Sequence, residues 1–280
     1  MSSALGDAID LRRCWPAVLM IGATTGVLSG LLGIGGAAIL VPGMTDLLGI
    51  SQHRAAGTSL FVMIPTAAVT AVIYALGAQM DWSLVLLFSL TAVLGATLGA
   101  RAMTRLSAAN LRRIFGLFLI FVAIRLIVPG GAPPAEAPAP GHILAQDPIV
   151  TVGEAALGLA GGFLSGLLGI GGGQVLTPGM IFFFGVPQKL AQGISIAFIV
   201  PTAFSGALTH YRRGNVLPRV GMLLVPCSMI GGVVGAWAVQ HIDAGALRLG
   251  FGIFLFYASA RMLAPKLLSD LFRRLAGRAA

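Results

Sequence analysis

The sequence predicts an all-α integral membrane protein built from two inverted-topology repeats. Of its 280 residues, 57% are hydrophobic and only 10% are charged, and the mean hydropathy is +0.94. About a quarter of the residues in a soluble domain are charged. Apolar stretches such as 55–77 and 82–106 contain 23 and 25 residues. At about 1.5 Å per residue, such helices cross the ~30 Å of hydrocarbon in a bilayer.

A nineteen-residue motif occurs twice and indicates an internal duplication. GVLSGLLGIGGAAILVPGM spans Gly26 to Met44, and GFLSGLLGIGGGQVLTPGM spans Gly162 to Met180; fourteen of the nineteen positions are identical, at an offset of 136. The same offset relates Pro65 to Pro201. Two apolar segments that are interrupted at corresponding places are typical of a transport site between repeats.

The duplication divides the chain into two membrane repeats, 15–128 and 149–266. The segment between them, 129–148, holds six of the fifteen prolines, so we expect an extracytoplasmic linker without a packed helix. Residues 267–280 form a basic tail, which we expect in the cytoplasm.

The leading apolar block of each repeat is too long for one crossing. In the first repeat it covers 34 residues, 15–48, and would measure about 51 Å as a straight helix. Gly33, Gly35, Gly36 and Pro42 interrupt it. We therefore expect a broken or re-entrant hairpin followed by three transmembrane helices in each half, which gives eight to ten membrane segments. Whether the hairpin crosses fully or is re-entrant stays open.

The basic residues predict the orientation of the two repeats. If the leading block returns to its starting side and the N-terminus is cytoplasmic, fifteen of the eighteen Lys and Arg residues lie inside, and only Arg125, Lys189 and Arg248 lie outside. Equivalent loops of the two halves carry opposite charge bias, so the halves have opposite orientations. We expect a multi-pass protein of the cell (inner) membrane with both termini in the cytoplasm.

The composition argues against several other classes of function. The net charge of +9 resides in short loops, which suits topology and lipid contact better than nucleic acid. The chain has two cysteines and four scattered histidines, so we expect no metal and no cofactor. Of the nine acidic residues, only Asp46 and Glu154 approach membrane depth, and neither has an acidic counterpart in the other half. We therefore expect neither a carboxylate relay nor an enzyme.

The two glycine clusters are the leading candidates for substrate binding. Glycine adopts positive φ, so successive N–H groups can converge on an anion, and a helix that begins there adds its dipole. The alternative is that the glycines only permit close packing or a bend. The candidate positions are Gly33, Gly35, Gly36, Gly169, Gly171, Gly172 and Gly173.

Polar residues near the same depth could line the path. Gln174 follows the second cluster, where the first half has Ala38, and its amide can donate two hydrogen bonds to an oxyanion. The hydroxyl candidates are Ser29, Ser165, Thr58, Ser59 and Ser195; such a hydroxyl can instead bond to its own helix. Pro65 and Pro201 are candidate hinges, or else static kinks.

His210 and Tyr211 end the second block of the second half. They are compatible with the inner mouth of a path and equally with a belt at the lipid headgroups. Tyr74 of the first half matches Tyr211 only after a one-residue gap. Arg125 and Arg261 end the fourth blocks, and we expect them to extend toward the interface.

The motifs resemble those of the TauE/SafE sulfite exporter family. The resemblance is carried by the GxLSGLLGIGGG pattern, by the segment from Pro187 to Ser195 with its first-half counterpart at 57–59, and by HYRRGNV at 210–216. It covers nearly the whole chain and implies a permease of sulfite, sulfonates or other small organic anions. The half-sites differ, with Ala37-Ala38 in one and Gly173-Gln174 in the other.

The sequence therefore predicts a transporter of a small anion that works by alternating access, with sulfite or an organosulfonate as the expected substrate. The alternatives are a passive anion channel of the same architecture and an intramembrane enzyme or assembly factor. The expected partners are a small-molecule anion and the lipid bilayer, without nucleic acid. The pattern is also compatible with a homo-oligomer.

Overall fold

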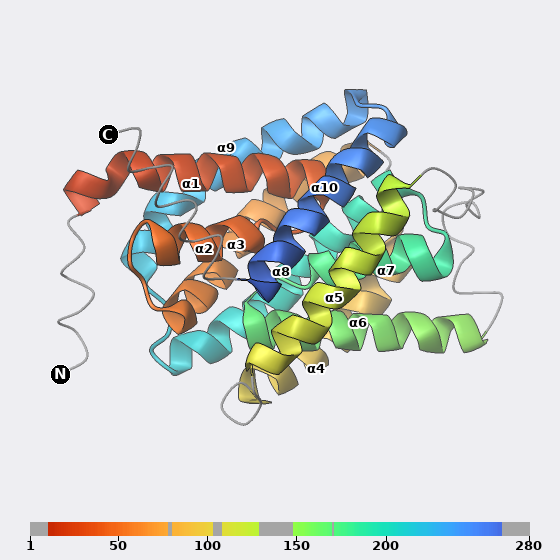
Figure 1. The fold of residues 1–280 in the computed structure, drawn as a ribbon, viewed down its shortest axis with the longest axis horizontal. Helices are drawn as coiled ribbons and strands as arrows, with labels where there is room; N and C mark the ends of the chain where they lie inside the picture. The colour runs from red at the N-terminus through yellow and green to blue at the C-terminus, as the bar shows by residue number, and fades with distance from the viewer. Residues whose placement is uncertain (1–10, 78–79, 103–107, 129–147, 170, 265–280) are drawn as a thin grey trace.

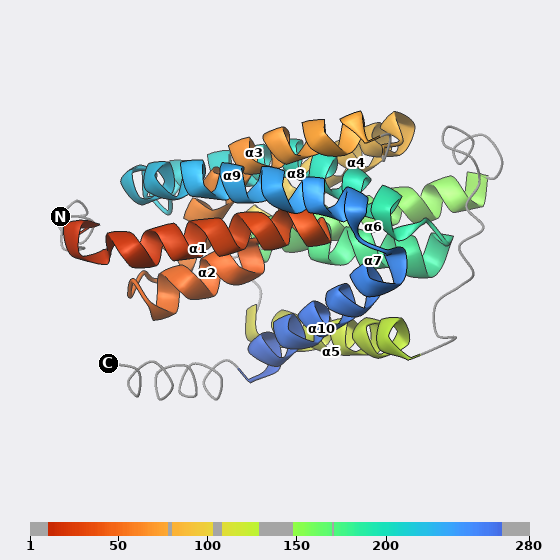
Figure 2. The same ribbon diagram turned by 90° about the horizontal axis from the view of Figure 1, so that it is seen from above.

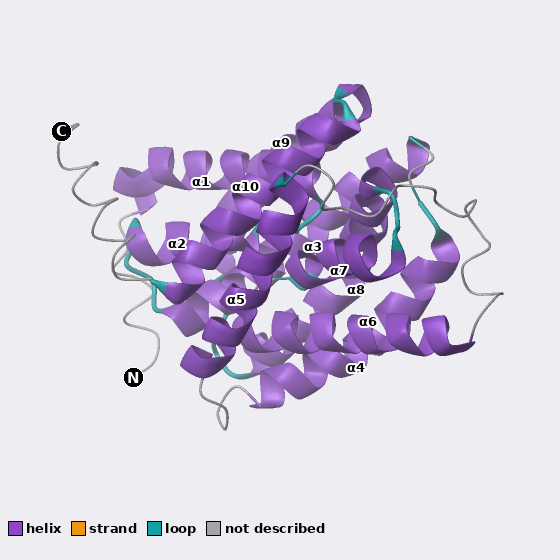
Figure 3. Ribbon diagram, turned by 45° about the vertical axis from the view of Figure 1, so that its right-hand side comes forward, coloured by secondary structure: helices purple, strands orange, loops and turns teal. Residues whose placement is uncertain are grey.

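The computed structural model describes residues 11–77, 80–102, 108–128, 148–169 and 171–264, and this part of the chain folds into helices joined by short connections (Figures 1 and 3). The helices are α1 (Leu11–Leu32), α2 (Ala37–Asp46), α3 (Gln52–Leu76), α4 (Trp82–Ala102), α5 (Ala108–Ile127), α6 (Pro148–Leu168), α7 (Gly173–Phe184), α8 (Gln188–Arg212), α9 (Pro218–His241) and α10 (Ala244–Leu263). Seven of them are long and apolar enough to cross a membrane. The protein is an all-α, multi-pass membrane protein, as predicted. Most of the predicted linker and the whole basic tail lie outside the described residues.

The duplication is visible in the helix boundaries. Helices α1 to α5 correspond to α6 to α10. The offset of 136 residues that relates the motifs also relates both ends of α3 and α8 and of α5 and α10, and the ends of the other pairs differ from it by at most three residues. Thus α3 and α8 are both 25 residues long, and α5 and α10 are both 20. The two halves have therefore kept the same helical framework.

Each half packs its first helix against the fourth helix of the other half. In α1, Gly26 lies against Ser228 and Gly30 against Ala236 of α9, so the two helices advance in the same direction. Helices α6 and α4 pack in the equivalent way (Figures 1 and 2). Backbone oxygens face these glycines so closely that a Cβ atom would clash. Small residues that allow two helices to approach are the usual basis of helix association in membranes.

The central helices α3 and α8 run in opposite directions. Gly57 of α3 faces His210 near the end of α8, and Leu60 faces Gly206 one turn earlier. Contacts along their lengths show that α3 is parallel to α9 and that α8 is parallel to α4. Helices α5 and α10 pair antiparallel as a layer to one side of the bundle (Figure 2). Each helix is thus antiparallel to its counterpart, which is consistent with the predicted inverted repeat.

Helix α4 separates a core face from an apolar outer face. Leu84, Phe88, Ala92 and Ala96 are fully buried at intervals of four residues. Leucines with the same spacing on the opposite face, Leu86, Leu90, Leu94 and Leu98, are 52–63% exposed. A regular row of exposed leucines on a protein of this composition suits contact with lipid chains, because such chains are as apolar as leucine.

Candidate functional site

Both leading blocks break at their glycine clusters. Gly33, Gly35 and Gly36 have φ of 68°, 76° and 75°, and their counterparts Gly169, Gly171 and Gly172 have φ of 69°, 80° and 74°. This left-handed conformation strains any residue with a side chain, so the three glycines of each break determine where α1 and α6 end. Gly173 has no such requirement: it is the first residue of α7.

The short helix after each break returns along the long helix before it. Gly36 packs on Thr25 and Ser29, and Gly43 packs on Ile21, so α2 runs back along α1. With 10 residues, α2 is about 15 Å long and reaches only halfway across a membrane. Helix α7 returns along α6 in the same manner. The leading block therefore consists of a full-length helix and a short returning helix.

The two breaks meet in the middle of the molecule. A Cβ atom added to Gly173 would lie 2.9 Å from the carbonyl oxygen of Gly33, 2.9 Å from Cα of Ile34 and 2.9 Å from Oγ of Ser195. The hydroxyl of Thr177 donates a hydrogen bond to the Gly33 carbonyl at 3.3 Å. The start of α7 is thus in direct contact with the break between α1 and α2.

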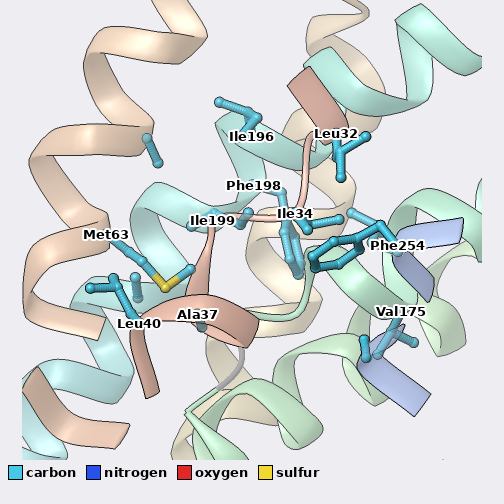
Figure 4. Close-up of a cluster of buried hydrophobic side chains, with 14 of the residues drawn as sticks. Leu32, Ile34, Ala37, Leu40, Met63, Val175, Ile196, Phe198, Ile199 and Phe254 are labelled. Atoms are coloured by element: carbon cyan, nitrogen blue, oxygen red, sulfur yellow. The ribbon is translucent and has the colours of Figure 1, made fainter. Parts of the chain in front are cut away.

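Helices α3 and α8 enclose this contact from both sides. Gln192 of α8 packs against Gly33, and its counterpart Ala56 of α3 packs against Gly169. The end of the Met63 side chain lies between Gly35 and Gly171, and Ile199, the counterpart of Met63, also touches Gly35. Figure 4 shows Met63, Ile199, Ile34 and Phe198 gathered around the break. The residues of this contact that the structure describes are buried.

Each break is followed directly by the N-terminus of a short helix. Neither Gly36, the N-cap of α2, nor Gly172, the N-cap of α7, provides a side chain to bond the free N–H groups of the first turn. The third N–H of each first turn, that of Ile39 or Val175, donates to the N-cap carbonyl at 3.0 Å. The N–H groups before it have no acceptor within their own helix and carry the positive end of the helix dipole. A helix N-terminus of this kind is a ready-made site for an anion.

Unpaired polar atoms surround the same place. Both amide atoms of Gln174 and of Gln192, and the hydroxyl of Ser195, are fully buried and have no hydrogen-bond partner among the described residues. A buried polar group without a partner costs about 1–3 kcal/mol. Such groups are therefore available to bond to a polar ligand. The further unpaired hydroxyls on α1 and α6 are those of Thr25, Ser29 and Ser165.

The corresponding hydroxyls of the first half are already used in the fold. Ser59, the counterpart of Ser195, donates to the carbonyls of Ala56 at 2.8 Å and of Gly169 at 3.0 Å. Thr58 accepts a hydrogen bond from the backbone N–H of Leu217 at 3.0 Å. Among the predicted hydroxyl candidates, Ser29, Ser165 and Ser195 thus have no partner among the described residues, whereas Thr58 and Ser59 each already form a hydrogen bond within the fold.

Gln192 was not among the residues predicted from the sequence. It lies on the face of α8 that covers Gly33, and its repeat counterpart is Ala56. A polar amide in one half against a methyl in the other is the same kind of signal that identified Gln174 against Ala38. Comparison of the two halves residue by residue could therefore have found Gln192.

The two candidate hinge prolines lie within continuous helices. Pro65 is inside α3 and Pro201 is inside α8. The next residue in each case, Thr66 or Thr202, donates its hydroxyl to the carbonyl four residues earlier, at 2.9 and 2.8 Å. Both sites therefore have identical local bonding, and motion about them stays a prediction.

Charged groups secure the far ends of the short helices. Arg261 of α10 forms an ion pair with Asp46, the last residue of α2, at 2.7 Å. Its side chain is 14% exposed, and whether Arg261 lies at the membrane interface stays a prediction. In the other half the equivalent Arg125 of α5 lies over the ring of Phe182 in α7, 5.5 Å from its centre. Both short helices are thus connected at their far ends to the α5–α10 layer.

Comparison with known proteins identifies the family. The sequence profile described as "Sulfite exporter TauE/SafE" matches residues 4–126 and 155–279. This chain belongs to the TauE/SafE family of membrane transporters. The two breaks and the unpaired amides beside them are therefore features of a TauE/SafE protein.

Individual relatives carry corresponding names. "Probable membrane transporter protein YunE" of Bacillus subtilis (strain 168) is 29% identical over 88% of this chain and 96% of its own length. A "Probable membrane transporter protein" of Xylella fastidiosa (strain 9a5c) is 27% identical over 84% of this chain and 89% of its own. "Probable membrane transporter protein MJ0441" of Methanocaldococcus jannaschii is 27% identical over 77% of this chain and 80% of its own length. No solved structure gives a significant match.

Proposed function

We propose that this TauE/SafE protein transports a small oxyanion of the sulfite or organosulfonate type, which binds between the two glycine breaks. The observation that carries the proposal is the contact of the start of α7 with Gly33 and Ile34, beside the unpaired amides of Gln174 and Gln192. The protein is not an enzyme in this account, because binding and movement of the anion are its whole activity.

Uncharged hydrogen-bond donors suit reversible binding of an anion. The anion is bound by first-turn N–H groups, by the amide N–H groups of Gln174 and Gln192 and by the hydroxyl of Ser195. Hydrogen bonds to an ionised acceptor are roughly twice as strong as those between neutral groups. They also leave no fixed cation at the site, so the anion can be released again. A site for conduction or transport must bind its ion without trapping it.

Alternating access follows from the pairing of the halves. The proposed site lies between elements of both halves, and its described residues are buried. Rocking of one half against the other about a fixed central site is the usual cycle of transporters with inverted repeats. In this cycle Pro65 and Pro201 provide the bending points. The protein lies in the inner membrane of the cell, with both termini in the cytoplasm.

Binding to the purified protein is the first test. Isethionate, sulfite, sulfate and acetate are titrated separately into detergent-solubilised protein, and heat and thermal stability are recorded. We expect the sulfonate and sulfite to bind and to raise the unfolding temperature, since a ligand that binds only the folded state stabilises it. If none of these anions binds, the proposed function is wrong.

Transport against a gradient separates a transporter from a passive channel. Proteoliposomes are loaded and diluted so that uptake of labelled isethionate must proceed uphill, driven by a pH or sodium gradient. A transporter accumulates the anion above the outside concentration. A channel only equilibrates it, so accumulation to equilibrium and no further would favour the channel.

A further inference from the structure

The end of the Met63 side chain fills the space between the two glycine breaks. A Cβ atom added to Gly35 or to Gly171 would clash with the Cε methyl of Met63, and one at Gly171 would lie 3.2 Å from its Sδ. Both glycines have the positive φ that disfavours other residues, so the breaks place no side chain of their own in this space. Met63 enters it from α3 and is 1% exposed. The space between Gly35 and Gly171 that the end of Met63 occupies is called the tail slot below.

The side chains around the tail slot are apolar. Ile199 of α8 borders it, with its Cδ1 2.9 Å from the Cβ position of Gly35. Figure 4 shows Met63 and Ile199 in one cluster with Ala37 and Leu40 of α2, and all four are buried. These side chains offer apolar contact and carry no hydrogen-bonding group that an ion would require. The slot therefore suits an apolar group better than a charged one.

Ile34 joins the tail slot to the unpaired polar groups. Its carbonyl oxygen lies 3.8 Å from the Cβ position of Gly171, which faces Met63, and its Cα lies 2.9 Å from the Cβ position of Gly173. That position of Gly173 is also 2.9 Å from Oγ of Ser195. Hydrogen-bond donors and the apolar slot thus adjoin the same residue. One small ligand with an oxyanion head and a short apolar tail can therefore contact both.

Methionine is suited to vacate such a slot. Its side chain is unbranched, has three rotatable bonds and changes rotamer without losing a strong hydrogen bond. The repeat counterpart of Met63 is Ile199, whose β-branched side chain is restricted at χ1. The first half thus supplies a flexible apolar chain at the break where the second half supplies a stiff one.

We propose that Met63 determines which tail the transported anion carries: the end of Met63 occupies the place of an uncharged, apolar tail, withdraws when the anion binds, and sets the length of tail that fits. This inference rests on the proposed function, in which the head of the anion binds to the unpaired amides. Each methylene of the tail that enters the slot leaves water and strengthens binding about fourfold. A charged tail loses its hydration among apolar walls and gains no partner there.

A series of unbranched alkanesulfonates, from methanesulfonate to hexanesulfonate, tests the tail slot by calorimetry on the detergent-solubilised full-length protein. For the wild type we expect the affinity to rise about fourfold with each methylene until the slot is full, and then to rise no further. 2-Aminoethanesulfonate adds a cation to the tail of ethanesulfonate. It should bind at least about tenfold more weakly than ethanesulfonate, because the slot provides no partner for the charge.

Substitution of Met63 should change the preferred tail length. Met63→Ala removes the side chain beyond Cβ, so the longest tail that still gains affinity should grow by about three carbons. Met63→Leu is a milder change that keeps the core filled, and should lengthen that tail by about one carbon. Met44→Ala is the matched control: Met44 is 0% exposed and lies seven residues after Ala37, or about 10 Å along α2. It should keep the wild-type dependence on tail length.

The outcomes separate the two proposals. If the wild type binds the sulfonates with an affinity that does not depend on tail length, Met63 does not determine the tail, while the anion site stands. The same conclusion follows if both Met63 variants keep the wild-type length dependence, or if Met44→Ala shifts it as much as Met63→Ala does. If the wild type binds neither the sulfonates nor sulfite, the proposed function fails and this inference fails with it.

Discussion

The two halves of this protein share one framework and differ at the site. The glycine breaks and the prolines 65 and 201 repeat at a single offset, and most helix boundaries follow it within three residues. The side chains around the breaks do not: Gln192 and Gln174 occupy the second half where the first has Ala56 and Ala38. The helical framework is therefore present twice, whereas the two unpaired amides lie in the second copy, to which we assign most of the proposed substrate recognition.

The ends of the short helices show the same divergence. Asp46 of α2 pairs with Arg261, whereas Phe182 of α7 lies under Arg125. The position of the arginine is preserved and its partner has changed from a carboxylate to an aromatic ring. One link is an ion pair and the other is a cation–π contact, so the two short helices need not be held with equal strength.

The largest effect on isethionate binding is expected when the first residue of a short helix, Gly173 in α7 or Ala37 in α2, is replaced by its counterpart in the other half. Gly173→Ala places a methyl group against the Gly33 carbonyl and Ile34, and should weaken isethionate binding about 100-fold, since overpacking costs up to about 3 kcal/mol. Ala37→Gly, the matched change in the first half, should leave binding within about threefold. Equal losses in both variants would show that the halves contribute alike.

Gln192→Ala should reduce affinity about 20-fold, because a hydrogen bond to a charged group contributes about 1.5–3 kcal/mol. Its unfolding temperature without ligand should not fall, since the lost amide has no partner to leave unpaired among the described residues. Titration calorimetry and thermal unfolding of the same preparations measure both. Unchanged affinity would remove Gln192 from the site.

A pair of serines separates binding from stability. Ser195→Ala should weaken isethionate binding about fivefold with little change in stability, because its hydroxyl is free. Ser59→Ala should instead lower the free energy of unfolding by about 1 kcal/mol, because it deletes the bond to the Gly169 carbonyl. The reverse pattern would contradict the assignment of recognition to the second half.

The smallest difference is expected at the far ends of α2 and α7. Asp46→Asn removes the charge opposite Arg261 and should cost about 1 kcal/mol of stability, since the pair is partly exposed. Phe182→Leu should cost about 0.5 kcal/mol through the lost cation–π contact. Thermal unfolding at low and high salt tests this, because only the ion pair should respond to salt.

Much of the architecture could be predicted from local sequence signals. Apolar blocks and glycine clusters gave the helices and the breaks, because φ > 0 at Gly33 and Gly169 is a local requirement. Contacts between the halves could not be obtained in this way. Gln192 reaches Gly33 only because α8 crosses the break, and Ser59 bonds to Gly169 only because α3 does.

The alignment of Tyr74 is another case in which the sequence alone does not reveal which residues occupy equivalent places in the two halves. The similarity of residue types favoured a gap and a match to Tyr211. The hydroxyl of Tyr74, however, donates to the carbonyl of Gly30, and it is Nε2 of His210 that lies 3.3 Å from the equivalent carbonyl of Gly166. Tyr211 is 62% exposed and faces outward instead. Side chains with different chemistry can occupy equivalent places, which identity of residue type alone does not reveal.

The position of a bound sulfonate tests the central claim most directly. Crystals of the wild-type protein soaked with 2-bromoethanesulfonate would be examined for the anomalous signal of bromine and for density of the sulfonate group. We predict the sulfonate between Gly33 and the start of α7, with its oxygens within hydrogen-bond distance of the amides of Gln174 and Gln192. A sulfonate bound elsewhere, with this contact still closed around Met63, would contradict the account.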